Sequence, residues 1–216
     1  MRIPPLGQHG LLPIGVHDCT FNEIKATFST FQGSDRRHRL FAKLEAFVID
    51  ARASRIVRSV LVDGSFVTAK PDPNDIDLVL VLPLAHDLKA DLSPAQYNLV
   101  SRRSVQNRYG FDMVAVRENT REYDEAVAFF PASARSGRVA ERHLEGGIMI
   151  ENTDQLQQAI EQMGRMQRIL ESYRADILPK NPRNFAVFAE GPLDEIRKLQ
   201  AEIDQYITRL EQVTVA

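Results

Sequence analysis

The chain has 216 residues, which allows one compact domain with an appendage or two small domains, and which is enough to bury a hydrophobic core. Its composition is that of an ordinary globular protein, and its net charge of −2 excludes a global field that would attract nucleic acid or a membrane surface. The single cysteine, Cys19, excludes an internal disulfide. Because no apolar run is long enough to span a bilayer or to act as a signal sequence, we expect a cytoplasmic protein without membrane contact.

The N-terminal part predicts an irregular strap followed by two helices. Residues 1–19 hold three prolines and three glycines without a period, which indicates an irregular segment. Thr20 and Glu23 form a capping-box pattern that begins a short helix. A longer helix is expected over residues 34–54. Its apolar side is Leu40, Phe41, Leu44, Phe47 and Val48, and its basic outer side is Arg36, Arg37, Arg39 and Lys43.

The next part predicts strands separated by helices. Strands are expected at RIVRSVLVDG (55–64), DIDLVLVLP (75–83), FDMVAV (111–116) and GGIMI (146–150). One helix is expected over residues 93–110, with Ser93 as its cap and Gly110 beyond its last turn, and a shorter one over 119–131, ended by Pro131. The order predicts a mixed α/β (α+β) domain over residues 1–150, in which helices flank a small mixed sheet.

Residues 151–216 predict a helical hairpin. Two series of apolar residues recur in steps of three and four on either side of the proline-containing segment LPKNPRN. The first series is Leu156, Ala159, Met163, Met166, Leu170, Tyr173 and Ile177; the second is Ile196, Leu199, Ile203, Tyr206, Leu210 and Val213. EGP at 190–192 marks a kink or a second start. A two-helix hairpin buries little by itself, so we expect it to contact the α/β domain, a protein partner or a second copy of the chain.

Acidic residues stand at the beginning of the second predicted strand. Because side chains alternate along a strand, Asp75 and Asp77 are expected on one side of it, opposite Ile76. Buried carboxylates are costly unless something compensates for them. Two carboxylates on one face can hold Mg²⁺ or Mn²⁺, which leaves further ligand positions for water and substrate phosphates.

Two further features complete a candidate nucleotide site. Gly64 and Ser65 end the preceding strand, where a glycine allows close approach of the backbone and a serine hydroxyl can bind a phosphate. Asp112 begins the third strand and supplies a third carboxylate, which can act as a base or complete a second metal site.

The spacing of these residues resembles a known superfamily. Gly-Ser, nine residues, Asp-Ile-Asp and a later strand aspartate resemble the nucleotidyltransferase-fold (DNA polymerase β-like) superfamily, and its minimal nucleotidyltransferases in particular. LLPIGVHDCTFNEI followed by DGSFVTAKPDPNDID also resembles a little-characterised bacterial family within it, and the likeness covers residues 10–150. It implies binding of a nucleoside triphosphate, such as ATP, with Mg²⁺ and transfer of a nucleoside monophosphate to an acceptor.

The resemblance also implies roles for individual residues. Gly64 and Ser65 would hold the triphosphate, Asp75 and Asp77 would ligate the metal, and Asp112 would be a base or third ligand. Many members carry a small-basic pair in the loop before the first aspartate, where this chain has TAKPDPN. Lys70 of this loop is therefore the expected phosphate contact. Arg103 joins it as a nucleotide-binding candidate, together with its neighbours Arg102 and Arg108 on the same predicted helix.

Structural interpretations stand beside these roles. Taken alone, Asp75 can close a turn, Asp77 can be a solvated strand-edge charge and Asp112 a solvated strand start. Basic residues near a helix end commonly favour the helix dipole and solvent. The adjacent residues 17–19 (His-Asp-Cys) cannot easily converge on one centre, so we expect them to anchor the strap.

Two functions from different classes follow. The first is a metal-dependent nucleotidyltransferase that modifies a protein, an RNA or a small molecule, within a toxin–antitoxin or phage-defence system or alone. The second is a catalytically weak or inactive protein of the same fold, similar to an antitoxin, that binds a partner through residues 151–216.

Overall fold

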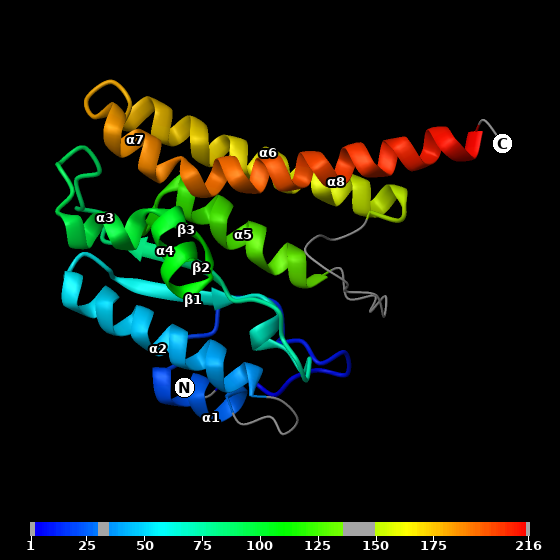
Figure 1. Cartoon of the computed structure of the whole chain (residues 1–216), viewed down its shortest axis with the longest axis horizontal. Coiled ribbons are helices and arrows are strands. Elements are labelled where there is room, and N and C mark those ends of the chain that lie inside the picture. Colours follow the sequence, from blue (N-terminus) through cyan, green and yellow to red (C-terminus); the bar gives the residue numbers. More distant parts are fainter. Residues whose placement is uncertain (1–2, 30–34, 136–149, 215–216) are drawn as a thin grey trace.

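The computed structural model describes residues 3–29, 35–135 and 150–214, and these form helices around a small sheet (Figure 1). The helices are α1 (Phe21–Phe28), α2 (Arg36–Ser54), α3 (Pro94–Val100), α4 (Arg102–Tyr109), α5 (Arg121–Arg135), α6 (Thr153–Asp176), α7 (Pro182–Phe188) and α8 (Glu190–Thr214), with a short 3₁₀ helix, η1, at Ser65–Val67. The strands are β1 (Ser59–Asp63), β2 (Asp77–Leu82) and β3 (Asp112–Arg117). The predicted class, a mixed α+β fold with C-terminal helices, is confirmed.

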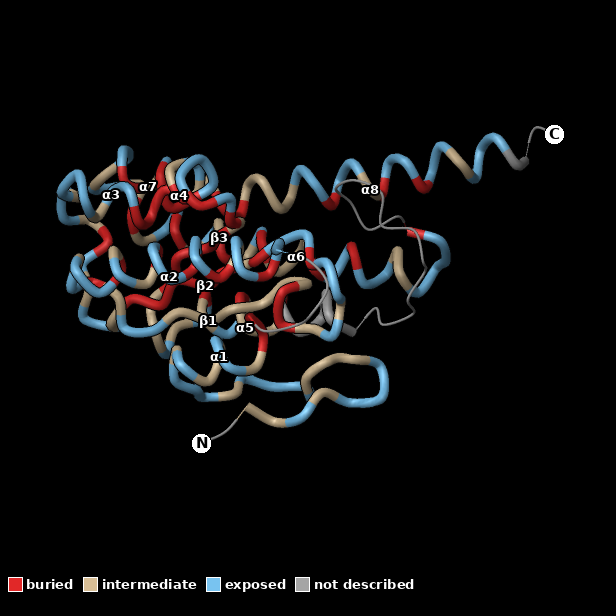
Figure 2. Tube along the Cα trace, turned by 60° about the horizontal axis from the view of Figure 1, so that its bottom comes forward, coloured by how far each residue is buried: buried red, intermediate tan, exposed pale blue. Residues whose placement is uncertain are grey.

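The sheet has the order β1-β2-β3, with β1 antiparallel and β3 parallel to the central β2. β2 is buried on both faces, because Leu78, Val79, Leu80 and Val81 are each at most 1% exposed. In Figure 2, β2 and β3 are mostly buried, whereas β1 is intermediate. A strand buried on both sides reads as a continuous apolar run, which explains why LVLVL follows the acidic triplet.

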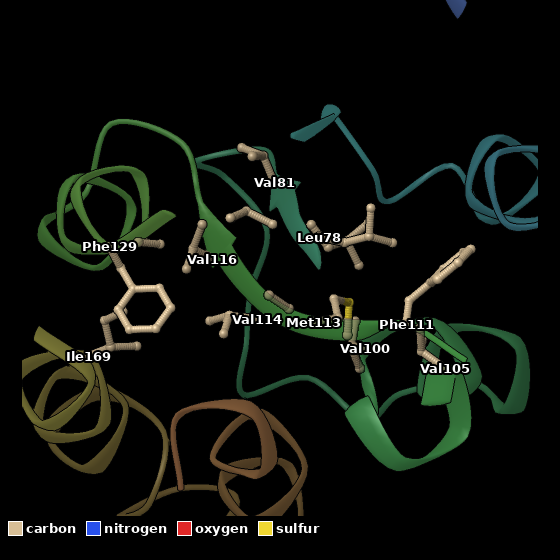
Figure 3. Packing of buried hydrophobic residues seen from close by; sticks show 14 of the residues in the cluster. Leu78, Val81, Val100, Val105, Phe111, Met113, Val114, Val116, Phe129 and Ile169 are labelled. Carbon is tan, nitrogen blue, oxygen red and sulfur yellow. The ribbon is translucent and has the colours of Figure 1, made fainter. Parts of the chain in front are cut away.

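Helices cover the sheet on both sides. In Figure 1, α1 and α2 lie on one side of the strands, and α6, α7 and α8 lie on the other, with α5 between the sheet and α6. Figure 3 shows Phe129 of α5 and Ile169 of α6 pointing toward one another beside β3. Side chains from residue 28 to residue 206 belong to one hydrophobic cluster, so the C-terminal helices share the core of the sheet.

The expected external contact of the hairpin is a contact with the α/β part of the chain. α6 packs against α8 and α5, and α8 packs against β3. The Tyr173 hydroxyl of α6 donates to the Ala115 carbonyl of β3 and is fully buried. Gly191 brings α8 close to β3, since a Cβ there would lie 2.5 Å from the Met113 carbonyl oxygen. The second start predicted at 190–192 is confirmed, because α7 ends at Phe188 and α8 begins at Glu190.

The irregular strap predicted at the N-terminus is also confirmed, since residues 3–19 form neither helix nor strand. Gly10 docks it on the loop that follows η1: its carbonyl accepts from the Ala69 amide at 2.8 Å, and its φ of +68° suits a glycine. After the strap, Thr20 and Glu23 form the predicted capping box of α1. The strap therefore supports the loop that joins β1 to β2.

Two predicted helices have different bounds in the structure. The single helix expected over 93–110 is wrong: Ser101 adopts an extended ψ of 114°, so α3 ends and α4 begins there. The Ser101 side chain accepts from the Ser104 amide at 3.3 Å and donates to Glu190 at 2.8 Å, which stabilises this break. The helix expected to end at Pro131 is also wrong in its bound, since α5 continues to Arg135.

Two predicted strands are not found as expected in the described residues. β2 begins at Asp77, so Asp75 precedes the strand rather than lying in it. The strand expected at 146–150 lies outside the described residues except for Ile150, which is buried and not in a strand. Within the described ranges, no helix is long and apolar enough to cross a membrane.

Arg37 was expected on the basic outer side of its helix, and this is wrong. The Arg37 side chain is fully buried. Its guanidinium donates to the carbonyl oxygens of Phe28 (3.0 Å), Phe66 (2.7 Å), Thr68 (2.7 Å) and Lys70. Arg37 lies one turn before Phe41 and two before Leu44, so helical spacing places it on the buried side; its charge led to the outward assignment, and the sequence cannot show the loop carbonyl groups that receive it. Arg37 thus ties α2 to the β1–β2 loop.

We predict that Arg37→Met lowers the free energy of unfolding by about 2–4 kcal/mol, because it leaves buried carbonyl groups without their donor. The matched control is Arg39→Met on the same helix, whose side chain is 78% exposed, with an expected change within about 0.5 kcal/mol. Urea unfolding followed by circular dichroism measures both. Equal unfolding midpoints for Arg37→Met and the wild type would contradict this role.

Candidate active site

Three aspartates lie side by side at one edge of the sheet. In the antiparallel pair, Asp63 is the register partner of Asp77, and in the parallel pair Asp77 is the partner of Asp112. The end of β1 and the beginnings of β2 and β3 meet at this edge. The structure therefore brings together Asp77 and Asp112, as the sequence predicted, and adds Asp63, which it did not predict.

Gly64 follows Asp63 and makes the close approach that the sequence suggested. Its φ of +86° is a conformation that other residues rarely adopt. A Cβ atom at Gly64 would lie 3.0 Å from Asp77 Oδ2 and 3.1 Å from the Asp77 amide nitrogen. A side chain at position 64 would therefore press on the carboxylate at the centre of the edge.

Ser65 and Asp75 close the connection between β1 and β2. Asp75 Oδ1 accepts from the Ser65 amide at 2.9 Å and from the Ser65 hydroxyl at 2.5 Å. The same hydroxyl oxygen accepts from the amides of Asn74 at 2.8 Å and Asp75 at 3.3 Å. In this arrangement Asp75 closes a turn, as the structural interpretation allowed, and one carboxylate oxygen remains for a second role.

Asp77 is the electrostatic centre of the site. Burial raises the pKa of its carboxyl group well above the usual range, and the negative charges of Asp75, Asp112, Glu195 and Asp63 raise it further. Among the described residues, no hydrogen bond or ion pair to the Asp77 carboxylate is present. These five residues, Asp63, Asp75, Asp77, Asp112 and Glu195, are called the acidic edge below.

Asp112 differs from Asp77, because two cations hold it. Arg102 Nη2 donates to Asp112 Oδ1 at 2.6 Å, and Lys198 Nζ of α8 donates to Asp112 Oδ2. Lys198 also donates to Glu195 Oε1 at 2.8 Å. Burial alone would lower the pKa of the Lys198 ammonium, but Glu195 and Asp112 together raise it. Helix α8 therefore contributes an acidic side chain, Glu195, and a basic side chain, Lys198, to the site.

Among the described residues, neither predicted phosphate contact is hydrogen-bonded to or paired with the acidic edge, and phosphate binding by them stays a prediction. Arg103 has a side chain that is 72% exposed and is 3.9 Å from Glu190, whereas its neighbour Arg102 points at Asp112. The Lys70 amide donates to the Thr68 hydroxyl and its carbonyl accepts from Arg37, which fixes the backbone of the loop at that point. The structure thus brings Arg102 to the acidic edge in place of Arg103.

The predicted metal ligands do not form a preassembled site. Throughout residues 3–29, 35–135 and 150–214, no three His, Cys, Asp or Glu side chains stand close enough together to hold a metal ion. The contacts above explain this, since Asp75 is turned toward Ser65, and Asp112 toward Arg102 and Lys198. Metal binding by these residues stays a prediction.

Sequence reasoning missed Asp63, Glu195 and Lys198 as members of the site, whereas Arg102 was named only as a neighbour of Arg103. Asp63 had a usable signal, because it directly precedes Gly64 at the end of a predicted strand. Glu195 and Lys198 had none, since they occupy outward positions of a helix whose docking on β3 depends on tertiary contacts. The sequence could not show which of Arg102 and Arg103 reaches the acidic edge, because this depends on the break between α3 and α4 at Ser101.

Comparison with known proteins shows which family the chain belongs to and which part of the site lies in the matched region. A family model described as "Family of unknown function (DUF6932)" matches residues 4–151. The chain belongs to the DUF6932 family. No curated protein and no solved structure matches it significantly. The DUF6932 region contains Gly64, Ser65 and the aspartates of the acidic edge, whereas Glu195 and Lys198 of α8 lie beyond it.

We predict that Asp63→Asn changes how stability depends on pH. Burial raises the pKa of Asp63 to about 6, although the Gly64 amide opposes this and Asp75 adds to it. Because the folded protein binds this proton more tightly than the unfolded chain does, Asp63 costs stability as the pH rises from about 4 to above 6. Asp63→Asn should therefore unfold with a free energy about 1–2 kcal/mol higher than the wild type at pH 7.5, and equal to it near pH 4.

Urea unfolding in EDTA at pH 4, 6 and 7.5 measures this difference. The chelator keeps divalent cations from offsetting the charge. A difference between the two proteins that is the same at all three pH values would contradict the assignment of a buried, titrating carboxyl group to Asp63.

Proposed function

We propose that the protein is a metal-dependent nucleotidyltransferase, which moves a nucleoside monophosphate from a nucleoside triphosphate to a protein, RNA or small-molecule acceptor. The observation that carries this proposal is the position of Asp77: a half-buried carboxylate among four other acids, to which no described residue gives a hydrogen bond or an ion pair. Such a carboxylate is costly unless a cation compensates for it.

The donor set suits a hard divalent cation. All the side-chain donors of the acidic edge are carboxylate oxygens, and Mg²⁺ commonly binds through one or two carboxylates together with water and substrate phosphates. Asp77 would hold it together with Asp75 or Asp112. Bound there, Mg²⁺ or Mn²⁺ would neutralise the edge and the charge of a triphosphate. Asp112 and Asp75 would have to release part of their present hydrogen bonds to take part.

The Gly64-Ser65 turn supports the phosphate side of the proposal. Gly64 lets the turn lie directly against Asp77, since a Cβ at position 64 would be 3.0 Å from Asp77 Oδ2, so a phosphate bound at the turn would lie next to this carboxylate. Ser65 carries a hydroxyl and an amide at this place, both now bonded to Asp75. Arg102 and Lys198 provide positive charge on the far side of Asp77, at Asp112.

In the proposed reaction, a hydroxyl oxygen of the acceptor attacks the α-phosphorus of the triphosphate. The new P–O bond forms there while the bond to the oxygen that bridges to the β-phosphorus breaks, and pyrophosphate leaves with that electron pair. The hydroxyl proton passes to a carboxylate of the acidic edge, for which Asp112 is the candidate. The chain contributes by positioning the groups and by fixing charge, and the buried β2 strand keeps Asp77 in place.

A second candidate is a protein of this fold that binds a partner and transfers nothing, similar to an antitoxin. One observation favours it: both oxygens of Asp112 are already paired with cations, as in a carboxylate with a structural role. Asp77 counts against it, because a site that had lost its cation would be more stable with a neutral residue there.

We predict that Asp77→Asn lowers nucleotidyl transfer at least about 100-fold and leaves the fold intact, because it removes the central carboxylate without changing its size. The assay incubates the full chain with each of the four α-labelled ribonucleoside triphosphates, Mg²⁺ or Mn²⁺, and a cell lysate, and follows label on acceptors. The matched control, Asp72→Asn, changes an aspartate of the same loop whose side chain is 58% exposed, and should keep wild-type activity.

Triphosphates labelled at the γ-phosphate distinguish nucleotidyl from phosphoryl transfer, since only the latter leaves that label on the acceptor. Transfer by Asp77→Asn at the wild-type rate would sink the assignment of the site. Absence of transfer in the wild type, combined with no Mn²⁺ binding by calorimetry, would favour the partner-binding protein.

A further inference from the structure

Two cations converge on one carboxylate of the acidic edge. Arg102 reaches Asp112 from α4 and Lys198 reaches it from α8, so each carboxylate oxygen accepts from a different helix. Asp77, the register neighbour of Asp112, receives neither of them. The positive charge of the site is therefore concentrated on one side of it.

A second carboxylate steadies each of these cations. Arg102 Nη1 donates to Asp194 Oδ2 at 2.7 Å, and Lys198 Nζ donates to Glu195 Oε1 at 2.8 Å. Both cations can therefore release Asp112 and still remain at the site. The Arg102 side chain is only 12% exposed, and its Nε is buried without a hydrogen-bond partner among the described residues. An unused buried donor shows that the present contacts of Arg102 do not exhaust its hydrogen-bonding capacity.

The charges at the edge decide what can displace these contacts. Six carboxyl groups gather here against two cationic side chains, Arg102 and Lys198; the carboxyl groups are those of Asp63, Asp75, Asp77, Asp112, Asp194 and Glu195. A polyphosphate alone would be repelled by this excess. A divalent cation would be attracted to Asp77 and would then compete with Arg102 and Lys198 for the oxygens of Asp112.

We propose that Arg102 and Lys198 are the triphosphate-binding cations of this site, which Asp112 holds in reserve until a divalent cation takes their place on its carboxylate. This rests on the proposed function and adds to it the residues that bind the phosphates and the condition under which they do so. Released from Asp112, the guanidinium and the ammonium face the metal-bound edge, where the phosphate oxygens of the nucleotide lie.

The arrangement links the two ligands thermodynamically. The metal frees two cations for phosphate, and phosphate in turn removes two competitors from the metal's carboxylate, so each ligand tightens the binding of the other by the same factor. Arg103 and Lys70 form no ion pair with Asp112 in the described part of the chain. Arg103 is mostly exposed near Glu190, and the Lys70 backbone belongs to the loop that Arg37 holds.

The test measures binding of Mn²⁺ alone, and of sodium tripolyphosphate with and without saturating Mn²⁺, by isothermal titration calorimetry on the full chain. In the wild type, Mn²⁺ should tighten tripolyphosphate binding at least about tenfold, the range expected of a charge-assisted hydrogen bond. Lys198→Met should move the two affinities in opposite directions: Mn²⁺ binds several-fold more tightly, and tripolyphosphate with Mn²⁺ at least about tenfold more weakly.

The control Arg197→Met removes a positive charge one residue away, where the side chain is 66% exposed and pairs with Asp194, and should change both affinities much less. Lys198→Arg should restore coupling, and Lys198→Gln repeats the measurement in case the methionine variant does not fold. Wild-type tripolyphosphate affinity in a folded Lys198→Met protein would overturn this inference and leave the proposed function standing. A wild type that binds no tripolyphosphate at saturating Mn²⁺ would overturn both.

Discussion

The pairing of β2 with both of its neighbours is the constraint on which the site depends. Antiparallel pairing puts the end of β1 beside the beginning of β2, and parallel pairing puts the beginning of β3 on the other side, so Asp63, Asp77 and Asp112 stand in one row. A shift of the register by one residue would send one of these side chains to the opposite face. The apolar run of β2, buried on both faces, fixes this register and thereby holds an unfavourable row of like charges in place.

The row of carboxyl groups destabilises the fold, and the hydrogen bonds and ion pairs that offset this are distributed unequally among them. Asp112 receives Arg102 and Lys198, Asp75 receives Ser65, and Asp77 receives none of them. Arg37, the most deeply buried cation, gives its hydrogen bonds to backbone carbonyl groups of the loop and not to the acids. Burial and the neighbouring acids raise the pKa of Asp77, so an ionised carboxylate at position 77 would need a cation to compensate for it, and this is the ground on which we propose one.

Local sequence patterns correctly predicted the features that depend on residues close together in the chain. The capping box of α1, the Gly110 end of α4, the strands that begin near Asp77 and Asp112, and the two-part hairpin all follow from residues close in sequence. Long-range contacts produced the differences. Arg37 is buried because a loop folds over it, and Lys198 reaches Asp112 because Gly191 lets α8 approach β3. The spacing within one helix shows neither the loop that receives Arg37 nor the docking of α8 on β3, so Glu195 and Lys198 lay beyond sequence reasoning.

The docking of α8 on β3 limits which experiments can distinguish the two candidate functions. Removing residues 151–216 would isolate the rest of the chain from a partner-binding module, but it would also expose the β3 surface under Tyr173 and remove Lys198 from Asp112. Loss of partner binding and loss of transfer would then have one cause, an unsupported sheet. Only substitutions that leave the packed faces of α6 and α8 intact can assign either function to the hairpin. Ile160 and Ile207 are suitable positions, because they are 44% and 45% exposed and lie outside the hydrophobic cluster that binds these helices to the sheet.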